Sequence, residues 1–248
     1  AAMSEFVNLN AENLDCEHLC CIIRKKPHPG VDAKREWLRA RLSEGHVFRK
    51  LNTEDCAFIE YAPLETAWVP MDGENFFYIY CLWVQGVPKG CGYGRRLMED
   101  CIADAQEKGK SGVCMLGSKK QKAWLSNQAF AEKFGFVPVD EAGEYVLLAL
   151  SFDGTQPRFR EGARKQVIDK KGLCVYYDDQ CPFIFQRIEK LRAYCSEHGI
   201  PARVIHIQSL EEAKEAPCPM NNWAVFWNGE FMTVNQIDGA YVEKIIKR

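Results

Sequence analysis

The sequence lacks the features of several large classes of protein. It has no apolar run long enough to cross a membrane, and its first residues lack the apolar core of a signal peptide. Positive charge is not in excess, because 34 Asp and Glu stand against 32 Lys and Arg, for a net charge of −2. Such a chain has no general attraction for nucleic acid or for an anionic membrane. We therefore expect neither kind of partner.

Cysteine, by contrast, is plentiful, with 12 among 248 residues. Several stand in apolar stretches, as small buried thiols do. Without a secretory signal we expect them to be reduced and the protein to be cytoplasmic. The group Cys16-x-His18-x-Cys20-Cys21 contains zinc-binding residue types. Its spacing matches no standard zinc pair and no second pair follows at the right distance, so we expect no metal site.

One stretch joins an apolar strand to a glycine-rich turn and a helix. Residues 76–84 are rich in aromatic and β-branched side chains, which is typical of a strand. Apolar residues over 97–105 recur at helical spacing. Between them stand glycines at 90, 92 and 94, with Lys89 and Arg95 beside them. Because free amides at a helix start bind anions, the stretch predicts a pyrophosphate site.

The spacing of these glycines excludes two common nucleotide sites. A dinucleotide fingerprint needs Gly-x-Gly-x-x-Gly, and a nucleotide-hydrolase loop ends in Gly-Lys-Ser/Thr, where this chain has Arg95-Arg96. Residues 89–94, Lys-Gly-Cys-Gly-Tyr-Gly, instead resemble the acetyl-CoA loop Gln/Arg-x-x-Gly-x-Gly/Ala of the GCN5-related N-acetyltransferase (GNAT) superfamily. Residues 130–136, Phe-Ala-Glu-Lys-Phe-Gly-Phe, resemble its closing signature. A glycine-rich turn that binds nothing is the alternative.

The order of the expected elements extends this resemblance over about residues 5–150. A short strand precedes two helices, one from Asn13 or Asp15 through Ile22 and one from Val31 to Ser43. Strands follow over 46–51, 56–63 and 76–84, then a helix, a strand over 112–117, a helix over 126–134 and two strands. This order is similar to that of the GNAT fold, an α/β (α+β) fold with a mixed, mostly antiparallel central sheet. We expect this domain to occupy residues 1–152.

The rest of the chain predicts a smaller α/β domain over residues 169–248, after a linker or wrapping segment over 153–168. A βαβ unit, a hairpin across Asn228-Gly229 and a final helix are similar to the thioredoxin-like fold. Residues 176–183 resemble that fold's active-site entry and place Cys181 at a helix start, which lowers a thiol pKa. No second cysteine follows three residues later, so Cys181 is paired with Cys218, glutathionylated or merely structural. The whole combination resembles the YoaP-like family of bacterial acetyltransferases.

The resemblance implies acetyl-CoA as the cofactor and direct attack of an acceptor amine on its thioester. The residues implied in cofactor binding are Leu82, Trp83, Val84, Lys89, Gly90, Cys91, Gly92, Tyr93, Gly94 and Arg95. Candidate catalytic residues on or near the central strands are Glu60, Glu65, Tyr80 and Cys81, a solvated carboxylate being the alternative for Glu60. The basic residues 119–122 either meet the adenosine 3′-phosphate or form a solvated loop.

One departure from the superfamily opens an alternative function. Many members carry a tyrosine in the closing helix to protonate the departing thiolate, and this chain has Ala131 there. We expect an N-acetyltransferase acting on a small amine, in a pocket made by residues 22–35, 62–75 and 138–145. The alternatives are a non-catalytic acyl-CoA sensor and a thiol-redox protein using Cys181. The sequence does not indicate an oligomeric state.

Overall fold

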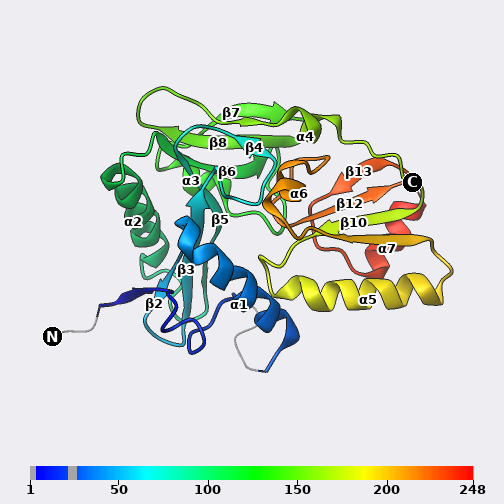
Figure 1. Ribbon diagram of the computed structural model, residues 1–248, viewed down its shortest axis with the longest axis horizontal. Helices are drawn as coiled ribbons and strands as arrows, with labels where there is room; N and C mark the ends of the chain where they lie inside the picture. Colours follow the sequence, from blue (N-terminus) through cyan, green and yellow to red (C-terminus); the bar gives the residue numbers. More distant parts are fainter. Residues whose placement is uncertain (1–3, 22–26, 248) are drawn as a thin grey trace.

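Two main sheets lie side by side in the computed structural model, which describes residues 4–21 and 27–247 (Figure 1). The larger has seven strands in the order β1-β2-β3-β5-β6-β8-β7. These are β1 (Phe6–Asn8), β2 (Val47–Leu51), β3 (Cys56–Pro63), β5 (Phe76–Gln85), β6 (Gly112–Ser118), β7 (Val137–Ala142) and β8 (Tyr145–Ser151). Only β5 and β6 are parallel neighbours. The prediction of a mixed, mostly antiparallel central sheet is confirmed.

Helices cover both faces of this sheet. Helix α1 (Pro29–Arg41) continues into a 3-10 turn, η1 (Leu42–Glu44), and packs on one face through Trp37 and Leu38. Helices α2 (Tyr93–Glu107) and α3 (Gln128–Glu132) pack on the opposite face. Apolar residues on alternate positions of the central strands therefore feed two separate cores, as the period of a strand requires.

The expected helix over residues 13–22 is wrong for the part that the structure describes, where residues 11–17 form turns. The Asn10 side-chain oxygen accepts hydrogen bonds from the amides of Glu12 and Asn13, at 2.9 and 3.0 Å. In turn, the Asn13 side-chain oxygen accepts a hydrogen bond from the Asn10 amide at 2.8 Å. Such bonds compete with helical ones and stabilise turns instead. The predicted end of the helix, Ile22, lies outside the described residues.

A β-bulge interrupts the central strand β5. Tyr61 pairs with Ile79 and Glu60 pairs with Cys81, so Tyr80 is the extra residue. Strand β6 accompanies β5 only from residue 76 to residue 79, so residues 80–85 continue beside β3 alone. A bulge re-aims the side chains that follow it, and here it stands where β5 and β6 part. The candidate site lies at this point.

The second sheet has the strand order β11-β10-β12-β13. Its strands are β10 (Leu173–Tyr177), β11 (Ala202–His206), β12 (Trp223–Trp227) and β13 (Glu230–Thr233), and the helices are α5 (Phe183–Glu197), α6 (Leu210–Lys214) and α7 (Gly239–Ile246). Strands β10 and β11 are parallel, and the remaining pairs are antiparallel. These elements lie where the sequence predicted them, whereas the likeness to thioredoxin stays a prediction.

The segment between the two predicted domains is structured. Its strand β9 (Arg158–Phe159) pairs with β4 (Met71–Asp72), and the short helix α4 (Glu161–Lys165) follows. Residues of both parts also belong to one apolar cluster, in which Tyr78 and Phe226 are fully buried. The C-terminal part therefore packs on the same face of the large sheet as α1 (Figure 1). The boundaries of the two domains stay a prediction.

Among the residues that the structure describes, no helix combines the length and the apolar character needed to cross a membrane.

Candidate active site

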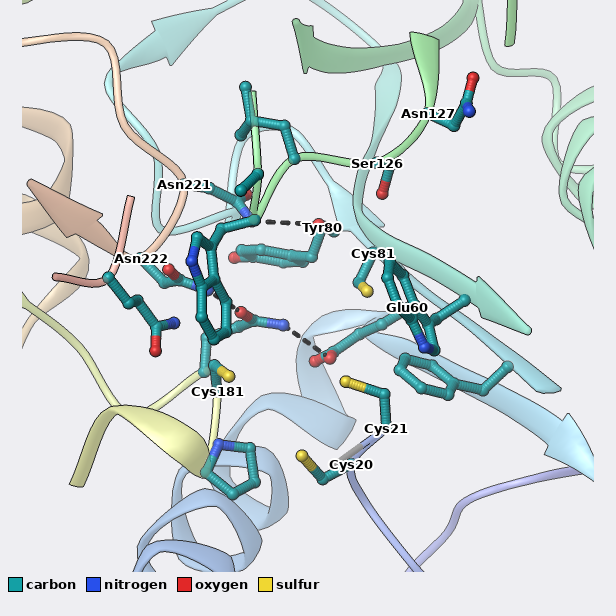
Figure 2. A pocket seen from close by; sticks show the side chains of 18 of the residues that line it. Cys20, Cys21, Glu60, Tyr80, Cys81, Ser126, Asn127, Cys181, Asn221 and Asn222 are labelled. Atoms are coloured by element: carbon teal, nitrogen blue, oxygen red, sulfur yellow. Dashed lines mark hydrogen bonds between the residues drawn. The ribbon is translucent and has the colours of Figure 1, made fainter. Parts of the chain in front are cut away.

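A cavity of about 590 Å³ opens beside the bulge of β5, between the large sheet and the C-terminal part (Figure 2). Its lining comes from seven separate stretches of the chain. The lining residues are Leu19, Cys20, Cys21, Phe58, Glu60, Tyr80, Cys81, Trp83, Gln121 to Asn127, Gln180, Cys181, Pro182, Asn221, Asn222 and Gln236. The predicted catalytic residues Glu60, Tyr80 and Cys81 therefore meet around one space of the size that a small molecule occupies.

Glu60 is the centre of a buried network of hydrogen bonds. The Lys34 ammonium donates to both of its carboxylate oxygens, at 2.6 and 2.7 Å. His46 Nε2 lies 2.7 Å from one oxygen, and Gln180 Nε2 donates to the other at 2.8 Å (the dashed line at Glu60 in Figure 2). The Glu60 side chain is 1% exposed. Gln180 thus links the C-terminal part directly to the central sheet.

This network keeps Glu60 ionised. Burial alone would raise the pKa of Glu60, but the positive charge of Lys34 and the hydrogen bond from His46 lower it below the ordinary value of 4.5. Burial lowers the pKa of His46 despite its bond to Glu60, so the ring is neutral at neutral pH. A carboxylate that accepts several hydrogen bonds and has a lowered pKa is a weak base.

Tyr80 and Cys81 are poor proton donors. The Tyr80 hydroxyl accepts a hydrogen bond from the Trp68 amide at 2.6 Å, and burial raises the pKa of Tyr80 well above 10. Burial and the nearby charge of Glu60 also raise the pKa of the Cys81 thiol. Both groups therefore stay protonated. Glu65, the other predicted base, is not among the cavity-lining residues, and its carboxylate accepts a bond from the Asn75 amide.

The predicted cofactor-binding residues lie along the end of β5, the turn after it and the start of α2. Gly86, Gly90 and Gly92 have φ angles of +74°, +83° and +80°, and a Cβ added to any of them would meet nothing within 4 Å. Gly92 precedes α2 and no side chain caps that helix. The first amides of a helix have no partner within it, so they face the open side of the turn. Lys89 and Arg95 are exposed beside them.

Residues 82–84 continue β5 toward this turn. The Leu82 amide donates a 3.1 Å hydrogen bond to the Ser126 hydroxyl, from the segment between β6 and α3. That segment also carries Trp124, whose ring stacks on Phe183 with centroids 5.3 Å apart. Trp83 is 43% exposed. Ala131, in the closing helix α3, is fully buried, so it presents no group to the cavity.

Sequence reasoning missed the partners that define the charge of this site. Lys34 and His46 gave no signal, because one lies in an amphipathic helix and the other at a strand start. Gln180 lies in the expected loop before Cys181, but nothing local pointed to Glu60. Of residues 119–122, Gln121 and Lys122 line the cavity, while Lys119 pairs with Glu141 at 3.8 Å. Within residues 4–21 and 27–247, no group of three or more His, Cys, Asp or Glu could hold a metal ion.

Two family models match the chain. The acetyltransferase (GNAT) family model matches residues 11–136, and the YoaP-like model matches residues 201–246. The uncharacterised N-acetyltransferase YoaP of Bacillus subtilis (strain 168) is 38% identical over 245 residues, which cover 97% of this chain and 98% of that protein. This relative spans both parts of the chain.

Solved structures of acetyltransferases are also similar, at lower identity. One is the PaiA N-acetyltransferase of Thermoplasma acidophilum in complex with coenzyme A, with 14% identity, a TM-score of 0.42, and 60% of this chain and 100% of that chain covered. Another is a GNAT family acetyltransferase of Brucella melitensis in complex with acetyl-CoA, with 14% identity, a TM-score of 0.39, and 62% and 91% covered.

The family follows from the GNAT model, which matches half of the chain, and from the relative that matches nearly all of it. The chain belongs to the acetyltransferase (GNAT) family and is an acyltransferase with acetyl-CoA as its cosubstrate.

Proposed function

We propose that this enzyme transfers the acetyl group of acetyl-CoA to the amine of a small molecule bound in the cavity beside Glu60. The single observation that carries the proposal is the position of the cavity. It opens at the β5 bulge, where the strand that leads to the glycine turn leaves its parallel neighbour. Acetyl-CoA would approach the bulge from the glycine turn, and the acceptor amine would approach it from the cavity.

The donor side of the proposal uses the turn after β5. Uncapped amides at the start of α2, together with Lys89 and Arg95, would hold the pyrophosphate of acetyl-CoA. Residues 90–94 supply backbone rather than side chains, which lets the phosphates come close. Trp83 and Val84 would line the path of the pantetheine arm toward the bulge. Tight binding of both acetyl-CoA and CoA is therefore expected.

The chemical step of the proposal is direct attack of a neutral amine on the thioester carbonyl. The Leu82 amide would polarise that carbonyl once the carbonyl displaces the Ser126 hydroxyl, to which this amide donates at 3.1 Å. We assign no protein acid to the departing thiolate, since Tyr80 and Cys81 hold their protons too firmly. A thiolate is a tolerable leaving group near neutral pH.

Glu60 would act toward the acceptor amine through hydrogen bonding, because the Lys34 ammonium already offsets its charge. Its lowered pKa argues against a role as the main base. The remaining lining is mostly apolar, with aromatic and aliphatic side chains and four thiols, and it carries neutral amides such as Gln180, Asn222 and Gln236. An amine with an apolar body and one or two polar groups fits this lining. Closure of the cavity by the C-terminal part favours a small acceptor over a protein chain.

Two measurements test the proposal on the full chain. Isothermal titration with acetyl-CoA checks the donor site, and release of the free thiol of CoA across a panel of small amines checks the transfer. We expect turnover with at least one aromatic or aliphatic amine, and none with the matched alcohol or carboxylic acid. Binding of acetyl-CoA without turnover on any amine would overturn the proposal and favour the acyl-CoA sensor suggested by Ala131.

A further inference from the structure

Four of the twelve cysteines line the cavity, although they come from three separate parts of the chain. They are Cys20 and Cys21 before α1, Cys81 after the bulge and Cys181 before α5 (Figure 2). Figure 2 shows the sulfurs of Cys20, Cys21 and Cys181 turned toward one shared space at the wall of the cavity. No disulfide joins any cysteine of the described residues. The acceptor cavity is therefore also a cluster of thiols.

Cys181 has the surroundings of a thiol that can act as a nucleophile. It precedes the 15-residue helix α5, and the nearby Phe183 amide and Gln236 side chain act to lower the pKa of its thiol. Gln236 is 5% exposed, and its side-chain oxygen has no partner. Donors to sulfur stabilise a thiolate. The Cys20 thiol and burial outweigh them and raise the pKa of Cys181, so the attacking form is scarce at neutral pH.

The two thiols differ in access. Cys181 is partly exposed, whereas Cys20 is 3% exposed. A small reagent that enters the cavity therefore meets Cys181 first. Cys20, whose sulfur points toward the same space as that of Cys181 (Figure 2), is in place to act second.

We propose that Cys20 and Cys181 form a reversible disulfide across the acceptor cavity, with a low-molecular-weight disulfide as the oxidant. The Cys181 thiolate attacks one sulfur of the small disulfide, whose S–S bond breaks and releases one thiolate. The Cys20 thiolate then attacks the Cys181 sulfur, the mixed disulfide breaks, and the second thiolate leaves. The two protons of the cysteines pass to the two released thiolates. The cysteine pair loses two electrons, and the small disulfide gains them.

The geometry assigns Cys181 a partner that the sequence did not indicate. Cys218, the partner considered from the sequence, is fully buried in an apolar cluster and does not line the cavity. A bond between Cys20 and Cys181 would instead tie the N-terminal wall of the cavity to the start of α5. Both thiols line the space that we assign to the acceptor, so acetyl transfer should fall when they are joined, an effect that rests on the proposed function.

The test is oxidation of the full chain by glutathione disulfide, followed by non-reducing digestion and mass spectrometry. We expect one main cross-link, between a peptide containing Cys20 and a peptide containing Cys181, which reduction removes. The exposed Cys16 and Cys91 should carry at most a glutathione adduct. Cys20→Ser should stop at the glutathione adduct of Cys181, and Cys181→Ser should give neither product. Cys16→Ser is the matched control, because Cys16 is exposed in the same N-terminal segment, and it should leave the link unchanged.

Other outcomes would overturn the proposal. A main link between Cys20 and Cys21, or between Cys181 and Cys218, would assign the chemistry to another pair. The proposal would also be overturned if Cys20 and Cys181 stayed unlinked under conditions in which glutathione disulfide reacts fully with Cys16. Closing a loop of this length should also raise the Tm of the oxidised chain, and an unchanged Tm would count against the link. These readouts need no acetyl transfer, so failure of the proposed function would leave them intact.

Discussion

The glycine turn after β5 presents mainly backbone groups, whereas the cavity beside the β5 bulge presents mainly side chains. The turn offers backbone: three of its glycines have positive φ angles and open space around them. The cavity offers side chains, many of them buried, and its central carboxylate is 1% exposed. The turn lies within one stretch of about ten residues, whereas the cavity combines seven stretches from residue 19 to residue 236.

This difference separates binding from stability. Exposed amides bind an anion without being needed for the fold, so damage to the turn should weaken acetyl-CoA binding and leave the protein folded. The cavity network joins α1, β3 and the C-terminal part through buried charges. Damage there should cost stability before it affects chemistry. Four substitutions test this separation.

Glu60→Gln should have the largest effect. The change removes the negative charge that faces Lys34, whose side chain is 1% exposed, and an unpaired buried charge costs about 3–5 kcal/mol. Urea unfolding measures the loss. The control is Glu99→Gln, because the exposed pair between Arg95 and Glu99 is worth less than about 1 kcal/mol. Equal stability of the two variants would contradict the central position of Glu60.

Glu60→Gln should also change how the free energy of unfolding depends on pH in acid. The pKa of Glu60 is lowered in the folded state, so its ionised form stabilises the fold above the ordinary value of 4.5. That contribution is lost as the pH falls below 4.5 through the folded pKa. The wild type should therefore lose its advantage over Glu60→Gln across this window, as measured by unfolding at a series of pH values.

Gly92→Val should come next, with acetyl-CoA binding weakened roughly tenfold to a hundredfold, or about 1.4–2.8 kcal/mol. A β-branched residue disfavours the φ of +80° that starts α2 and moves the amides that we assign to the pyrophosphate. Isothermal titration measures the affinity. Gly154→Val is the matched control, because Gly154 has a φ of +85° and equally open surroundings in another turn. An equal loss of affinity in both variants would exclude a role for the turn.

The two regions also differ in what the sequence revealed. The turn was recognisable because Lys89, the glycines and the apolar pattern of α2 are neighbours in the chain. Most strands and helices were predictable for the same local reason. The helix expected over 13–22 failed because the side chains of Asn10 and Asn13 bond to nearby amides, a local competition that apolar spacing does not reveal.

The cavity was only half predictable. Glu60, Tyr80 and Cys81 were found because they lie on the strands that lead to the turn. Their partners were not, because Gln180 follows Glu60 by 120 residues. The bulge at Tyr80 is likewise a property of strand pairing, which depends on the register of β3 and β5. Contacts of this range depend on how the two parts pack together, which the spacing of residues within either part does not encode.

Tyr78→Phe tests that packing, with a smaller expected effect. The Tyr78 hydroxyl donates to the Asn221 side-chain oxygen at 2.7 Å in a buried contact between the two parts. Removing the hydroxyl leaves that oxygen without its donor, at a cost of about 1–2 kcal/mol. Urea unfolding should show a single transition at lower denaturant. Tyr241→Phe, at a residue that is 42% exposed, should change stability by less than about 0.5 kcal/mol.

Lys214 should give the smallest effect, visible only as a dependence on pH. Its ammonium donates to the carbonyls of Leu64 and Met71, and burial lowers its pKa from 10.5 to about 8. Between pH 8 and pH 10.5 the lysine of the unfolded chain holds a proton that the lysine of the folded chain has released. Unfolding therefore takes up a proton, and raising the pH makes unfolding less favourable. Relative to Lys214→Met, the wild type should gain about 1 kcal/mol between pH 8 and pH 9. As a control, Lys190→Met changes an exposed residue, and comparison with it should show no such gain. Parallel pH curves for the wild type and Lys214→Met would contradict the burial of Lys214 between the two parts.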